Sequence, residues 1–135
     1  MAIIGIEHVN IRTACLPETI HFYRDILGMT VAPPPGRSDL SDGAWVYGSD
    51  GSAVLHIGDA ALVCPGETQA PATVPSDTGT IHHVALSCDD YGQVRELIEA
   101  DEIALTANDL PQFNLRQIFI RDPNGVLVEL NFHSV

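Results

Sequence analysis

A short pattern occurs twice in this chain, and the repeat limits the folds it can adopt more than any other feature. Residues 5–11 alternate between apolar and polar side chains, and so do residues 80–86. The two segments align when His8 is placed on His83, an offset of 75 residues (83 − 8 = 75). Alternation of this kind predicts a half-buried strand in each segment. A pattern that returns at a fixed interval indicates two copies of one supersecondary unit.

Each of these strands precedes a predicted helix. In the first copy, apolar residues at spacings of three and four follow Pro17, and Gly28 is a natural stop. In the second copy, Asp89 and Asp90 can cap the helix that begins after them. Strand-like segments follow both helices, at 29–32, 44–47 and 53–57, and then at 103–106, 117–121 and 126–132. The sequence therefore predicts an α+β fold of two βαβββ modules in tandem.

The length of 135 residues suits a single domain. We expect module one at 1–64, a linker rich in proline and small residues at 65–79, and module two at 80–135. One module would not easily bury both faces of its sheet, whereas two modules packed together would.

Charge and cysteine content exclude several classes of protein. The formal charge of −12 repels phosphate backbones and anionic lipid, so we expect no nucleic acid and no membrane partner. No apolar run approaches the ~20 residues that span a bilayer, and the N-terminus lacks the pattern of a secretory signal. The expected location is the cytoplasm. Three separated cysteines without a CxxC motif fit reduced thiols and carry no functional signal.

Four polar residues occupy equivalent places in the repeat. His8 and His83 lie on the opening strands, and His56 aligns with Glu129 on the closing strands at an offset of 73 (129 − 56 = 73). All four have apolar neighbours, where an unpaired polar group is costly. Imidazoles with a carboxylate suit Zn, Fe, Mn, Co or Ni.

Any one of these histidines alone is more often a hydrogen-bonded structural residue than a ligand. The joint placement of the four favours a metal site, and His56 is the weakest member. We assign structural roles to the other histidines, His21, His82 and His133.

The chain resembles the vicinal oxygen chelate superfamily, which includes glyoxalase I, fosfomycin-resistance proteins, methylmalonyl-CoA epimerase and type I extradiol dioxygenases. The resemblance is carried by four blocks: His8-Val9-Asn10-Ile11, residues 22–29 (FYRDILGM), His83-Val84-Ala85-Leu86 and residues 119–130 (FIRDPNGVLVEL).

The resemblance implies a cup-shaped mixed sheet around one divalent metal ion, a small-molecule substrate and a homodimer. The recurrent ligands of the family fall on His8, His83 and Glu129, and a fourth ligand place falls on His56. In the glyoxalase, carboxylate ligands also transfer protons. Either Glu129 does this work, or His56 is a base beside the metal.

Residues that contact substrate are inferred from the same pattern. Arg12 stands where glyoxalase I has an arginine that holds the glutathione carboxylate, although it could equally be a surface charge. The rest of the glutathione-contacting pattern is missing at residues 58–61. Strand alternation sends Asn10 and Arg12 to the side of His8. Tyr47 and Phe119 are further candidates, whereas Trp45 is interpreted as ordinary sheet packing.

The leading hypothesis is a metal-dependent lyase or isomerase of the glyoxalase type, in which the metal binds vicinal oxygens of a small substrate and stabilises an enediolate. The first alternative is an Fe(II) extradiol-type ring-cleaving dioxygenase, because two histidines and a glutamate form a facial triad. The second alternative is a non-enzymatic resistance protein that binds a small molecule.

Overall fold

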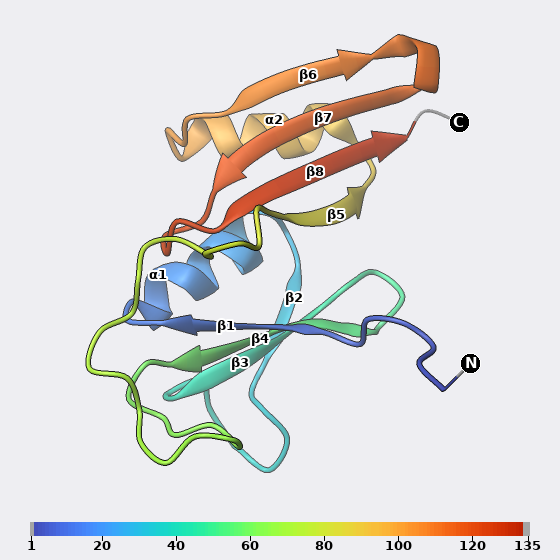
Figure 1. Ribbon diagram of the computed structural model, residues 1–135. Coiled ribbons are helices and arrows are strands. Elements are labelled where there is room, and N and C mark those ends of the chain that lie inside the picture. The colour runs from blue at the N-terminus through green and yellow to red at the C-terminus, as the bar shows by residue number, and fades with distance from the viewer. Residues whose placement is uncertain (1, 134–135) are drawn as a thin grey trace. The chain divides into compact units, whose positions relative to one another are not determined.

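The computed structural model describes residues 2–133, which fall into two compact units (Figure 1). Unit 1 is Met1–Val74 and unit 2 is Pro75–Val135. The division lies inside the segment 65–79. The assignment of 1–135 to one domain stays a prediction.

Unit 1 contains β1 (Val9–Thr13), α1 (Leu16–His21), a π-helical turn η1 (Phe22–Ile26), β2 (Thr30–Ala32), β3 (Gly43–Tyr47) and β4 (Ala53–Asp59). Its sheet has the order β1-β4-β3-β2. β1 and β4 pair in parallel and the remaining neighbours are antiparallel. Gly28, with φ +71°, follows the helical segment, as its sequence position predicted.

Unit 2 contains β5 (Val84–Cys88), α2 (Tyr91–Ala100), β6 (Thr106–Leu110), a 3₁₀ turn η2 (Pro111–Phe113), β7 (Leu115–Arg121) and β8 (Leu127–His133). Its sheet order is β5-β8-β7-β6, again with a parallel first pair. Both units therefore have the same βαβββ topology and a mixed sheet (Figure 1). The α+β fold with tandem modules is confirmed.

Local signals explain where unit 2 turns. The Asp90 side chain accepts a hydrogen bond from the backbone N–H of Gln93 and so caps α2. Between β7 and β8, Asp122 Oδ1 accepts from the N–H groups of Asn124 (2.8 Å) and Val126 (2.9 Å). This turn needs the left-handed conformation of Gly125, whose φ is +85°.

In each unit one face of the sheet is apolar and buried. In unit 1 this face carries Ile11, Thr13, Ala44, Val46, Leu55 and Ile57, and in unit 2 it carries Ile118, Ile120, Val128, Leu130 and Phe132. Thr13 Oγ1 lies 3.1 Å from Thr19 Oγ1 of α1, and Phe132 contacts Tyr91 of α2 edge to face. The helices therefore cover these faces. Because side chains alternate along a strand, the intervening polar residues lie on the opposite faces.

The structure differs from the predicted elements at three places. His8 and His83 directly precede β1 and β5 and are not within them. The strand expected at 103–106 lies instead at Thr106–Leu110. The reason is that the Ile103 N–H still donates to Ile98 O (3.2 Å), which closes the end of α2 before the chain becomes extended.

In the part of the chain that the structure describes, every helix is too short or too polar to cross a membrane.

Candidate functional site

The registers of the two sheets place the predicted ligands at equivalent positions. In the parallel pair of unit 1, Asn10 faces His56, and in that of unit 2, Ala85 faces Glu129. The antiparallel partner of His56 is Trp45, and that of Glu129 is Phe119. The alignment of His56 with Glu129 in the sequence therefore agrees with their placement in the sheets.

In unit 1, aromatic rings gather on the face opposite α1. His56 stacks on Trp45 with ring centroids 4.5 Å apart and planes inclined by 7°. His8 meets Trp45 edge to face at 4.8 Å, and the His8 and His56 rings are 6.4 Å apart. Trp45 thus contacts both predicted ligands of this unit, a role that sequence reasoning missed.

The ring nitrogens of these histidines have polar neighbours. Asn10 Nδ2 lies 3.0 Å from His56 Nδ1, and His8 Nδ1 lies 3.1 Å from the carboxylate of Glu7. Burial lowers the pKa of His56, and the charge of His8 lowers it further. His56 is therefore a neutral imidazole near pH 7.

In unit 2, the imidazole and the carboxylate meet directly. His83 Nε2 lies 3.0 Å from Glu129 Oε2, with the Glu129 side chain 13% exposed and that of His83 38% exposed. The other ring nitrogen of His83, Nδ1, lies 2.9 Å from His82 Nδ1. His82, assigned a structural role from the sequence, is thus adjacent to this pair.

The separation of His83 and Glu129 suits a metal ion. Metal–nitrogen and metal–oxygen bonds of ~2.0–2.2 Å place two ligands at right angles about 3 Å apart. The observed 3.0 Å between Nε2 and Oε2 matches that spacing, and both atom types are ordinary ligands of divalent transition metals. Within either unit taken by itself, the described residues contain no group of three His, Cys, Asp or Glu that could hold a metal ion.

A hydrogen-bonded group of amide side chains contacts Glu129 through Gln117. Gln117 Nε2 donates to Glu129 Oε1 (2.9 Å) and to Asn131 Oδ1 (3.0 Å), while Asn108 Nδ2 donates to Gln117 Oε1 (2.8 Å). Sequence reasoning missed these amides. The available signal was alternation, which places Gln117 and Phe119 on one face of β7, and Glu129 and Asn131 on one face of β8.

Arg12 has a partner of its own in unit 1. Its guanidinium pairs with the Glu67 carboxylate (Nη1 to Oε2 2.9 Å), and its Nη2 lies 3.3 Å from Cys64 Sγ. Glu67 also accepts from the Cys64 N–H (3.0 Å). The hydrogen bond from Arg12, supported by that from Cys64, lowers the pKa of Glu67 to about 2. An anionic substrate group at Arg12 would therefore compete with Glu67.

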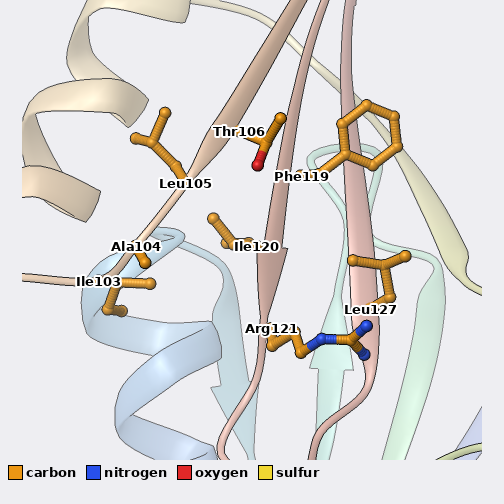
Figure 2. Close-up of a pocket in the computed structure, with 8 residues that line it drawn as sticks. All are labelled: Ile103, Ala104, Leu105, Thr106, Phe119, Ile120, Arg121 and Leu127. Carbon is orange, nitrogen blue, oxygen red and sulfur yellow. The ribbon is translucent and has the colours of Figure 1, made fainter.

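The other predicted substrate contacts lie on the two sheets. Tyr47 is half-buried at the end of β3, beside an irregularity in the register between Val46 and Tyr47. Phe119 lies beside Glu129 and at one end of a groove in unit 2 (Figure 2). The groove is lined by Ile103, Ala104, Leu105, Thr106, Phe119, Ile120, Arg121 and Leu127. Figure 2 shows the Arg121 side chain reaching toward Leu127 at its other end.

The sequence model of the Glyoxalase/Bleomycin resistance protein/Dioxygenase superfamily matches residues 5–130. The chain belongs to this superfamily. The match spans both opening strands, both α-helices and the first closing strand, and it reaches Leu130 of the second, so the resemblance to the vicinal oxygen chelate proteins is confirmed.

Solved structures of other superfamily proteins share the fold. A glyoxalase/dioxygenase from Nostoc punctiforme is 17% identical with a TM-score of 0.72, over 97% of this chain and 92% of that one. The fosfomycin resistance protein FosX from Listeria monocytogenes is 18% identical with a TM-score of 0.68, over 98% and 96%. Lactoylglutathione lyase from Agrobacterium tumefaciens is 20% identical with a TM-score of 0.63, over 95% and 92%. No curated protein gives a significant match.

Proposed function

We propose that this superfamily member is a metal-dependent lyase or isomerase of the glyoxalase type, acting on a small substrate with vicinal oxygen atoms. The observation that carries the proposal is the His83–Glu129 pair, whose 3.0 Å separation suits adjacent ligands of one metal ion. The equivalent positions of unit 1 carry His8 and His56, which is the arrangement expected of a duplicated metal-binding unit.

The proposed ligands are His8, His83 and Glu129, with one divalent ion of Zn, Fe, Mn, Ni or Co. When bound, such an ion supplies Lewis acidity toward the two substrate oxygens. The side chains of the protein orient the substrate and move its proton.

We assign proton abstraction to Glu129 and stabilisation of a substrate oxygen to His56. The Asn10 amide N–H points at His56 Nδ1, so Nδ1 is the acceptor and the proton of the neutral ring resides on Nε2. An Nε2–H donor suits a developing negative charge on oxygen and has no lone pair for a metal or for a proton. This favours a position of His56 beside the metal ion, where it is not one of the ligands.

Trp45 and Phe119 each lie directly across the strands from a proposed site residue, His56 and Glu129 respectively. We propose that these rings, with Tyr47, Asn10 and Arg12, contact the substrate. Because Arg12 is already paired with Glu67, a substrate other than a glutathione adduct is favoured.

The first experiment is elemental analysis of protein purified without added metal, repeated on Glu129→Ala and His56→Ala. We expect about one metal per chain, lost in Glu129→Ala and retained in His56→Ala. Isomerisation of 2-oxoaldehyde adducts and of other α-hydroxycarbonyl substrates is then assayed with all three proteins. A metal-free wild type that still turns over these substrates would refute the proposal.

A ring-cleaving dioxygenase is the second candidate, favoured by the two-histidine, one-carboxylate set with a neutral His56 nearby. Iron in the purified protein together with oxygen uptake on catechols would establish it. A binding protein of the bleomycin-resistance kind is the third. Undiminished ligand binding by metal-free protein and by Glu129→Ala would establish that role.

A further inference from the structure

Gln117 occupies a central place on the polar face of unit 2. It lies on β7, directly across from Asn108 of β6 on one side and from Asn131 of β8 on the other. Its carbonyl accepts from Asn108, and its amide nitrogen donates to both Asn131 and Glu129. Both hydrogens of the Gln117 amide nitrogen are therefore used, and the orientation of the amide is determined by three partners.

Each carboxylate oxygen of Glu129 has a different neighbour. Oε1 receives the Gln117 amide at 2.9 Å, and Oε2 lies 3.0 Å from His83 Nε2. A hydrogen bond to a carboxylate is stronger than one between neutral groups, so Oε1 is held firmly. Oε2 is left as the oxygen directed toward His83.

Among the described residues of unit 1, there is no counterpart of the Gln117 hydrogen bonds. The cross-strand pair Gln117 and Asn131 of unit 2 corresponds to Gly43 and Gly58 of unit 1. A Cβ atom at Gly43 would lie 2.8 Å from the backbone oxygen of Ile57, so no side chain fits there. In unit 1 the hydrogen bond to the site residue comes instead from Asn10 on β1, where unit 2 has Ala85.

We propose that Gln117 is a positioning residue that makes Glu129 a ligand through Oε2 alone. This rests on the proposed function, because it assumes that Glu129 binds the metal. Without the Gln117 amide, the carboxylate can rotate and offer both oxygens. A hydrogen-bonded partner behind a ligand commonly changes metal affinity by about 10–100-fold.

The test uses Co²⁺ titrated into metal-free protein, with affinity from calorimetry and coordination from visible absorption. The variant is Gln117→Met, which has a similar shape and no amide, and the matched control is Gln112→Met at an exposed position of η2. We expect Gln117→Met to bind Co²⁺ about 10–100-fold more weakly. Its visible bands should also weaken, because a carboxylate that binds through two oxygens raises the coordination number. The control should match the wild type.

Gln117→Asn is measured alongside, because its shorter amide brings no apolar group to the polar face, and the same losses are expected. Wild-type affinity and an unchanged spectrum in a folded Gln117 variant, with Co²⁺ binding lost in Glu129→Ala, would overturn the role of Gln117 alone. Failure of the wild type to bind Co²⁺, or equal binding by Glu129→Ala, would overturn the proposed function and this inference together.

Discussion

The imidazole of His56 lies flat on the indole of Trp45, with ring centroids 4.5 Å apart and an interplanar angle of 7°. Trp45 is the only tryptophan in the sequence, so all tryptophan fluorescence comes from this ring, which contacts both His56 and His8. The stack fixes the plane of His56, and Asn10 fixes one of its ring nitrogens. Together these two contacts fix the orientation of the ring and therefore the direction in which Nε2 points.

Tryptophan fluorescence should fall on acidification with a midpoint below pH 6.5. A protonated imidazole stacked on an indole quenches the fluorescence of the indole. The midpoint is expected below 6.5 because burial, together with His8, lowers the pKa of His56 from that value. Because the pKa is lowered in the folded state, the contribution of His56 to stability is complete above pH 6.5 and is lost as the pH falls through the folded value. His56→Leu should remove the quenching by the stacked ring and so reduce the amplitude of the transition, and His8→Leu should retain that quenching with a midpoint at a slightly higher pH. A midpoint at or above 6.5 would show that burial and His8 do not lower the pKa of His56 in solution.

Asn10→Asp should reverse the tautomer of His56. The carboxylate accepts hydrogen bonds but cannot donate them, so Nδ1 would carry the proton and Nε2 would expose its lone pair. Nitrogen NMR of the imidazole distinguishes the two tautomers directly. The wild type should show a protonated Nε2, and Asn10→Asp a protonated Nδ1. Identical spectra would mean that Asn10 does not determine the tautomer.

The Cys64 amide resonance should titrate with a midpoint near pH 2. This amide donates to Glu67, whose pKa the Arg12 guanidinium lowers to about 2. A lowered carboxylate pKa means that the contact stabilises the fold above about pH 4.5 and is lost as the pH falls to about 2. Glu67→Gln should remove the titration, and Glu18→Gln should leave it unchanged. A midpoint near 4.5 would show that the ion pair does not persist in solution.

Gly125→Ala should destabilise unit 2 by roughly 2 kcal/mol or more, because Gly125 has φ +85° and an added Cβ would lie 1.9 Å from the backbone oxygen of Ser76. Gly79→Ala is the matched control. It also has a positive φ of +66° but open space around the added carbon, so about 1 kcal/mol is expected. Urea denaturation measures both. Equal losses would mean that the contact with Ser76 relaxes at little cost.

The repeat predicted the two βαβββ modules, because strand alternation and helix punctuation are local properties of the chain, and the family resemblance added the mixed sheet. Alternation also predicted that Asn10 lies on the same side as His8, and in the structure the side chains of both lie near His56. The position of β6 was not predictable, because it depends on where a hydrogen bond between Ile98 and Ile103 ends α2.

The Arg12–Glu67 ion pair could not be predicted from the sequence for a different reason. It joins β1 to a segment 55 residues later that has no regular pattern, and no local signal connects the two. A prediction of the Gln117 hydrogen bonds likewise requires the registers of two strand pairs, β6 with β7 and β7 with β8. Side-chain contacts of this kind depend on how the strands pair in the folded sheet, and sequence periodicity does not predict them.

The parallel pairings of β1 with β4 and of β5 with β8 have a consequence for synthesis. The first strand of each unit is made early and pairs with the last strand of that unit, about 45 residues later. A nascent chain therefore holds His8 without β4, which carries His56, until β4 has left the ribosome. It likewise holds His83 without β8, which carries Glu129, until β8 has left the ribosome. Under the proposed function, the single metal site would be complete only when β8, which carries Glu129, has left the ribosome, so a truncated chain without β8 would lack a proposed ligand.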